Sequence, residues 1–349
     1  MNNKWLRYVI GLLLTVLTLW LSFRNLDWQA LRESLSRVKF FWVFLGAVNV
    51  VFSAFIVSWR WQYILKSKIN VSMADIFKVN IISQYLNILI PARFGELIKV
   101  WLVSRRYKCS GVYVLGTVAV DKMFDFFALV VLGFFAPLFF AFKENLKGYT
   151  VAFIVCAVLI PLLILMVWKK ELFQRWLLWF TKFLPKKFKL RERIIHFFDK
   201  GTEAFVLLRN MTSLGNLITI TLFIIMSEAL TNFILFQAFG FTLSIWSALV
   251  LQLVLMVGMA PPSVPGKIGI FEYAVIFGLT TFGIDKSLAL SCALMLHLVA
   301  YLPKIILGFI FMGSYHISIK KAETGIKQFD DEARSQLNHD NEIMITNNN

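Results

Sequence analysis

The chain has 349 residues, of which 58% are hydrophobic and 16% are aromatic, and its formal net charge is +16. Soluble domains average roughly 45–50% apolar residues, so this composition excludes an ordinary soluble domain. The basic residues lie in loops beside apolar segments. There Lys and Arg orient a membrane protein and contact anionic headgroups, so we expect no nucleic-acid partner.

Long uncharged runs occupy residues 40–59, 148–168 and 229–266. Each run is long enough to cross about 30 Å of hydrocarbon as a helix. The runs are continuously apolar rather than alternating, which disfavours a β-barrel. The sequence therefore predicts an all-α, polytopic helical membrane protein.

In chain order, the first half contains a span, a polar stretch, a second span, a broken segment and a long charged helix. We predict these elements at residues 6–22, 24–39, 40–65, 75–104 and 111–141. The polar stretch is either an amphipathic interfacial helix or a loop. The second span ends in Trp59-Arg60-Trp61-Gln62-Tyr63, which is typical of a headgroup belt.

The second half contains a similar order of elements. We predict a span at 149–168, a basic loop at 169–209, a span at 212–240, a broken segment at 245–283 and a last span at 287–313. Residues 1–315 would form one membrane domain, and residues 316–349 a polar cytoplasmic tail that is partly disordered.

Both broken segments combine proline, a basic residue, glycine and glutamate within apolar sequence. In the first, Pro91 ends or kinks a helix, and Gly95 permits backbone angles that other residues resist. In the second, the corresponding residues are Pro265, Gly266 and Gly269. Paired interruptions at corresponding places in two halves of a chain indicate a transport site.

The loop charges predict the orientation. Placing the basic stretches 99–108 and 169–209 in the cytoplasm puts both termini on that side as well. If each broken segment returns to the side from which it entered, residues 40–141 and 212–313 are two span–re-entrant–span units of opposite orientation. The sequence therefore predicts an inverted repeat, in which one central site faces either leaflet by rocking.

Ionisable residues accumulate around the two breaks. At membrane depth such groups cost roughly 2.5–3.5 kcal/mol each, so they should be paired and face a wet cavity. We predict a substrate-binding chamber in which Arg93 and Lys267 bind an anionic group such as a lipid phosphate, while acidic residues hold the bases or exchange protons or cations. The candidates are Arg93, Glu96, Lys99, Asp121, Lys122, Asp125, Glu228, Lys267, Glu272 and Lys304.

A structural reading of the same charges stays open, in which they form a salt-bridge network that locks the hairpins. Lys304 fits a gate or a snorkelling charge equally well. We expect His297 to bond a neighbouring hydroxyl or carbonyl, and Asn232 and Gln252 to make interhelical hydrogen bonds. The three cysteines have no metal-like spacing, so we expect neither a metal nor a cofactor.

Three motifs carry a resemblance to a known family: Asn87-x3-Pro91-x-Arg93-x-Gly95-Glu96, Asp121-Lys122-x2-Asp125 and Pro265-Gly266-x2-Gly269-x2-Glu272. Over about residues 5–315 the chain resembles the flippase-like membrane domain family. That family includes the membrane half of lysylphosphatidylglycerol synthases and archaeal proteins acting on dolichol-phosphate sugars. Where the family has Glu-Arg before the aspartate, this chain has Asp121-Lys122, which preserves charge but not the guanidinium.

The resemblance implies translocation of an anionic or headgroup-modified lipid, either a phospholipid or a polyprenyl-phosphate sugar. No soluble catalytic motif is present, so we expect a multi-pass plasma-membrane transporter and not an enzyme. Its expected partners are lipids with anionic headgroups and a lipid-modifying enzyme. The alternative is a membrane-embedded enzyme or accessory subunit in polyprenyl-phosphate-sugar or aminoacyl-phospholipid metabolism.

Overall fold

The computed structural model describes residues 3–24, 26–90, 94–139, 208, 210–260 and 265–315. Within these ranges all regular structure is helical, which confirms the predicted all-α class. The predicted span at 149–168, nearly all of the basic loop at 169–209 and the tail at 316–349 lie outside the described residues.

Two helices precede the first long span. They are α1 (Asn3–Phe23) and α2 (Trp28–Ser36), so the polar stretch after the first span is a helix and not a loop. Asp27 fixes the start of α2, because its Oδ1 accepts hydrogen bonds from the Gln29 and Ala30 amides at 2.9 and 3.0 Å. This is the usual N-cap arrangement, which satisfies helix donors that have no intrahelical partner.

The order long helix, two short helices, long helix then occurs twice. The first unit is α3 (Phe40–Leu65), α4 (Met73–Leu89), α5 (Phe94–Arg106) and α6 (Gly111–Phe139). The second is α10 (Met211–Phe239), α11 (Ile245–Gly258), a 3-10 turn (Pro265–Lys267), α12 (Ile270–Thr280) and α13 (Lys286–Ser314). These bounds follow the predicted elements closely, including both breaks.

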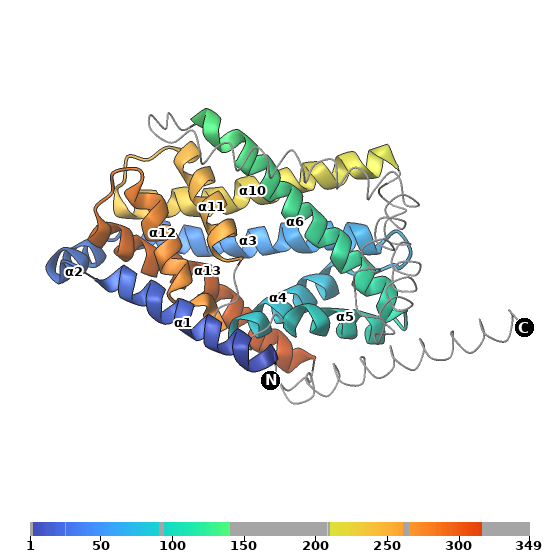
Figure 1. Ribbon diagram of the computed structural model, residues 1–349. Coiled ribbons are helices and arrows are strands. Elements are labelled where there is room, and N and C mark those ends of the chain that lie inside the picture. The colour runs from blue at the N-terminus through green and yellow to red at the C-terminus, as the bar shows by residue number, and fades with distance from the viewer. Residues whose placement is uncertain are drawn as a thin grey trace, which may run out of the picture.

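The two short helix pairs lie toward opposite ends of the bundle. In Figure 1, α3 and α10 run side by side, with α4 and α5 toward one end and α11 and α12 toward the other. This placement is what insertion from opposite membrane faces would give. An inverted repeat relating residues 40–141 to 212–313 stays a prediction.

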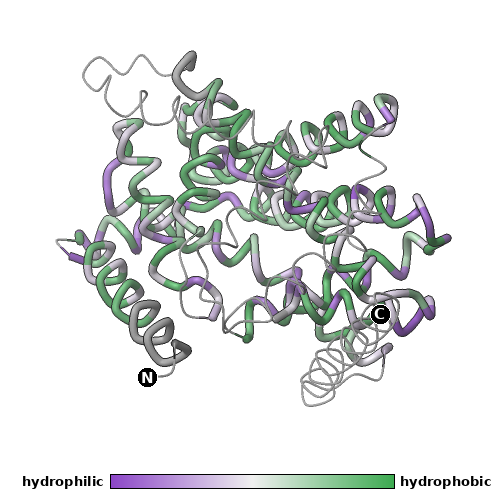
Figure 2. Tube along the Cα trace, turned by 45° about the vertical axis from the view of Figure 1, so that its right-hand side comes forward, coloured by the Kyte–Doolittle hydropathy of each residue, from purple (hydrophilic) through white to green (hydrophobic). Residues whose placement is uncertain are grey.

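Among the described helices, α3, α10 and α13 are long and apolar enough to cross a membrane. Their outer faces carry large apolar side chains; Phe41 and Phe309 are each 70% exposed. Figure 2 shows the hydrophobic helices with hydrophilic stretches at their ends and within the bundle. The exposed apolar faces suit lipid, and the internal polar stretches place the polar groups of the protein inside the helix bundle.

The first break lies between the end of α4 and the start of α5. The Gly95 amide donates to Asn87 Oδ1 at 2.8 Å, so the side chain of α4 caps the start of α5. A Cβ on Gly95 would lie 2.0 Å from the Ser83 carbonyl oxygen. Glycine is therefore required at this position by close approach, which explains one residue of the motif.

The described part of the second break contains two glycines with positive φ. Gly266 and Gly269 have φ of 71° and 88°, in the region that L-residues with side chains avoid. A Cβ on Gly269 would also lie 2.7 Å from Thr18 Oγ1 of α1. These glycines let α12 start directly beneath the break and against α1.

A polar cluster ties the base of the first hairpin to the end of α13. Asp75 in the first turn of α4 accepts from Arg106 Nε at 2.9 Å, Tyr107 Oη at 2.8 Å and Tyr315 Oη at 3.1 Å. The Arg106 guanidinium also lies 5.2 Å from the centre of the Tyr315 ring. The cluster joins segments that are far apart in sequence and lies outside the three spanning helices.

We predict that Gly308→Ala destabilises the protein by about 1–3 kcal/mol, because overpacking at a closed helix contact forces side chains and backbone to shift. The added Cβ would lie 2.3 Å from Tyr85 Cβ, where α13 crosses α4. Thermal unfolding in detergent measures the effect. Gly313→Ala on the same helix is the matched control, since nothing lies within 4 Å of its Cβ position. Equal melting temperatures for the two variants would contradict the close contact.

We predict that Asp75→Asn lowers stability by about 1 kcal/mol at neutral pH, and that this difference fades in acid. Burial alone would raise the pKa of Asp75, but hydrogen bonds from Tyr107 and Arg106 outweigh it and hold the pKa below 3.8. A lowered folded-state pKa stabilises the protein above the unfolded value, and this contribution is lost as the pH falls through the folded pKa. Melting curves of both proteins from pH 7 down to pH 3 test this. A difference that stays constant with pH would refute it.

Candidate functional site

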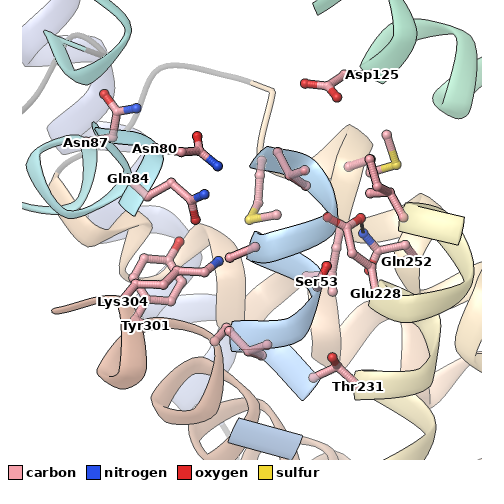
Figure 3. Close-up of a pocket in the computed structure, with 18 of the residues that line it drawn as sticks. Ser53, Asn80, Gln84, Asn87, Asp125, Glu228, Thr231, Gln252, Tyr301 and Lys304 are labelled. Carbon is pink, nitrogen blue, oxygen red and sulfur yellow. Dashed lines mark hydrogen bonds between the residues drawn. The ribbon is translucent and has the colours of Figure 1, made fainter. Parts of the chain in front are cut away.

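A cavity of about 440 Å³ lies between the two units, lined by residues of α3, α4, α5 and α6 and of α10, α11, α12 and α13. Most of the predicted site residues contribute to its wall. They are Glu96, Lys99, Asp121, Lys122, Asp125, Glu228, Gly266, Lys267 and Lys304. Figure 3 shows part of this wall, with side chains of separate helices pointing into one space.

Arg60 of α3 lies at the centre of the charged wall. It is 0% exposed, and its Nε donates to Asp121 Oδ1 at 2.8 Å. Its Nη2 donates to the Asp121 carbonyl oxygen at 3.2 Å and forms a salt bridge with Asp125, while its Nη1 donates to Thr221 Oγ1 of α10 at 3.2 Å. The guanidinium thus joins three helices, and each of its nitrogens has an acceptor.

The salt bridges close into a ring of alternating charge. Lys99 Nζ lies 3.9 Å from Asp121 Oδ2 and 2.9 Å from Glu96 Oε2. Lys122 Nζ lies 3.4 Å from Glu96 Oε1 and 3.0 Å from Asp125 Oδ2. With Arg60, the ring has three bases and three carboxylates. We call these residues the charge ring: Arg60, Asp121, Lys99, Glu96, Lys122 and Asp125.

The sequence-based reading of Arg60 was wrong. The motif Trp59-Arg60-Trp61 predicted a headgroup belt, but Arg60 and Trp61 are buried at 0% and 1% exposure and only Trp59 faces outward, at 45%. The Trp61 ring packs inside the bundle against Lys99 Nζ, 4.6 Å from the ring centre. The helical spacing of two acidic residues, Asp121 and Asp125, was the signal for a buried base facing α6.

Across the cavity, a polar chain leads from α10 to α11 and back. Asn232 Nδ2 donates to Gln252 Oε1 at 3.2 Å, and Gln252 Nε2 donates to Glu228 Oε2 at 2.6 Å. The predicted interhelical role of Asn232 and Gln252 is therefore confirmed. Within the described residues, the donor that orients the Glu228 carboxylate is the neutral Gln252 amide.

Lys304 and three carboxamides form another part of the wall. Asn80, Gln84 and Asn87 lie at helical spacing on one face of α4, and in Figure 3 they and Lys304 point into the cavity beside Tyr301. Lys267 at the second break donates to the Met259 carbonyl oxygen at 3.0 Å and lines the cavity too. Charge and hydrogen-bond donors therefore concentrate on this side.

Glu272 has a different position from the one that the motif predicts. Its Oε2 accepts from the Gly269 amide at 2.6 Å, which caps α12, and its Oε1 lies 2.5 Å from His297 Nδ1. It is 4% exposed and is absent from the described cavity wall. His297 was expected to bond a hydroxyl or carbonyl, and this was wrong, because its partner is the Glu272 carboxylate.

Pro91 and Arg93 lie outside the described residues, so the predicted pairing of Arg93 with an anion stays a prediction. Pro265 and Gly266 lie in the 3-10 turn, and Gly269 precedes α12. Among the residues that the structure describes, no group of three or more His, Cys, Asp or Glu side chains is placed to hold a metal ion.

Comparison with known proteins shows the family to which this protein belongs. The family model of the lysylphosphatidylglycerol synthase transmembrane region matches residues 8–308, which is most of the chain and both helix units. The chain belongs to this family. Its fold is therefore that of a helical membrane protein, as the composition predicts.

Archaeal relatives extend the comparison. The chain is 27% identical to a UPF0104 membrane protein of Methanocaldococcus jannaschii over 224 residues, which cover 64% of this chain and 91% of the relative. It is 23% identical to a UPF0104 membrane protein of Pyrococcus horikoshii over 328 residues, which cover 88% of this chain and 95% of the relative. The names of these relatives describe membrane proteins and give no substrate.

We predict that Arg60→Ala costs about 3–5 kcal/mol of stability, because it leaves buried carboxylates without their partner. Thermal unfolding in detergent measures the loss. Lys66→Ala, at the exposed end of the same helix, is the control and should change stability by less than about 0.5 kcal/mol. In the double variant with Asp121→Ala, we expect the two costs to be less than additive. Additive costs would show that the pair does not act as a unit.

Proposed function

We propose that this protein translocates a phosphate-bearing lipid headgroup across the membrane through its central cavity. The observation that carries the proposal is a cavity of about 440 Å³, lined in part by charged and carboxamide side chains, between helices whose outer faces are apolar. This volume falls within the roughly 300–1,000 Å³ of typical small-ligand sites. A headgroup would occupy the cavity while its acyl or prenyl tails stay in lipid.

The residue classes in the wall support a phosphate as the ligand. Lys304 offers an ammonium group, and Gln84 and Asn87 offer amide donors from the helix that faces it. Charge-assisted hydrogen bonds of this kind are roughly twice as strong as neutral ones. The charge ring supplies a fixed wall for this site, since each of its bases is already paired with a carboxylate.

The order of the helices supports transport over catalysis. The two units place helix breaks toward opposite ends of the bundle, the arrangement associated with alternating access to a central site. We therefore propose a transporter and not an enzyme, located in the plasma membrane with both termini in the cytoplasm. Its partners would be membrane lipids and an enzyme that modifies them.

Reconstitution into vesicles tests the proposal. We expect the parent protein to move acyl-labelled phospholipids between leaflets faster than empty vesicles, as measured by chemical quenching of the outer label. Lys304→Gln should slow transfer about tenfold, because an ammonium–phosphate contact is lost. Lys66→Gln makes the same chemical change at an exposed position and should leave transfer unchanged.

Two results would contradict the proposed function. One is equal transfer by parent and empty vesicles across phospholipids and polyprenyl phosphates. The other is transfer that Lys304→Gln and Lys66→Gln leave equally fast, since the cavity would then take no part. Arg93→Ala, assayed in parallel, tests the sequence-based prediction for that residue.

A further inference from the structure

The walls of the cavity differ in how their charged side chains are paired. In the charge ring, Arg60, Lys99 and Lys122 alternate with Glu96, Asp121 and Asp125, so three positive and three negative charges cancel. A ligand therefore meets no net charge on the wall formed by α3, α5 and α6. Its charge preference depends on the other ionisable groups that line the cavity.

Glu228 presents a carboxylate that no cation neutralises within salt-bridge distance among the described residues. Its Oε2 accepts from the neutral Gln252 amide, and Asn232 holds that amide in place from the other side. Its Oε1 has no hydrogen-bond donor in the part of the chain that the structure describes. Because Glu228 is half-buried and lines the cavity, this oxygen is accessible to a ligand donor, and a positively charged donor suits a carboxylate best.

Lys304 presents the opposite charge from the other side of the cavity. Its ammonium group makes no hydrogen bond or salt bridge with any residue in the described ranges. Figure 3 shows it and Glu228 entering the cavity from different helices, α13 and α10. Lys267 differs, because its ammonium already binds the Met259 carbonyl oxygen.

We propose that the cavity selects a zwitterionic headgroup, with the phosphate at Lys304 and an ammonium group at Glu228. The inference rests on the proposed function and specifies its substrate class. A headgroup with one phosphate and one amine on a short carbon link, as in phosphatidylethanolamine, carries one charge that complements Lys304 and one that complements Glu228. Gln84 and Asn87 add donors for the phosphate oxygens, and Gln252 keeps the carboxylate oriented for the amine.

Other headgroup charges fit this wall less well. A purely anionic headgroup satisfies Lys304 but places its negative charge in the same space as Glu228, which disfavours it. A headgroup with two amines can place one amine at Glu228. Its second amine then repels the lysines of the cavity wall, Lys267 and Lys304. Charge complementarity therefore favours one positive and one negative group, and selection against the other lipids comes from repulsion.

Transfer assays with lipids that differ only in headgroup test the inference. We would label the acyl chains and leave the headgroups intact, then compare phosphatidylethanolamine, phosphatidylglycerol and aminoacylated phosphatidylglycerol. The parent should transfer phosphatidylethanolamine about tenfold faster than phosphatidylglycerol. Glu228→Gln, which keeps the shape and removes the charge, should lower this ratio to about one. Glu33→Gln, on the exposed face of α2, is the control and should leave the ratio unchanged.

A binding measurement keeps the inference testable apart from transport. Titration of the detergent-solubilised protein with short-chain phosphatidylethanolamine should show about tenfold tighter binding than with short-chain phosphatidylglycerol, and Glu228→Gln should abolish the preference. The melting temperature of the variant controls for folding. Equal transfer of all three lipids, or fastest transfer of the anionic or aminoacylated lipid, would overturn the inference and leave the proposed function standing. Transfer no faster than in empty vesicles would overturn the proposed function itself.

Discussion

The structure depends on acceptors that offset the desolvation cost of one buried guanidinium, that of Arg60. Arg60 is fully buried, and removing such a group from water costs several kcal/mol that only well-placed acceptors recover. Asp121 and Asp125 supply two carboxylates from one face of α6, and Thr221 supplies a hydroxyl from α10. The constraint thereby fixes the relative position of α3, α6 and α10.

This constraint also decides what the remaining charges can do. Lys99 and Lys122 extend the pairing to Glu96 of the first hairpin. Each charged group of the ring therefore already has a partner of opposite charge within the ring. The structural and functional readings of these residues are then compatible. The ring holds its wall in place, and in the proposed function a substrate would interact with the wall opposite.

The sequence predicted the helices better than the partners of individual side chains. Apolar runs and the two proline–glycine breaks report on local chain geometry, so α3, the hairpins and α13 appear close to their expected bounds. Pairing depends on which helices become neighbours, which no local pattern encodes. The sequence predicted an interfacial Arg60 because it lies between two tryptophans, although it is buried. It predicted Glu272 as a ligand, although this residue caps α12 and contacts His297.

The two units share an order of helices but differ in their chemistry. All six residues of the charge ring come from α3, α5 and α6, whereas Glu228, Lys267 and Lys304 come from the second unit. A change in the position of α13 would therefore move Lys304 past a neutral wall, without separating the paired charges of the ring. Such a movement avoids the desolvation cost that opening the ring would incur. An unequal division of charge between the two units would thus leave the ring intact while Lys304 changes its position in the cavity.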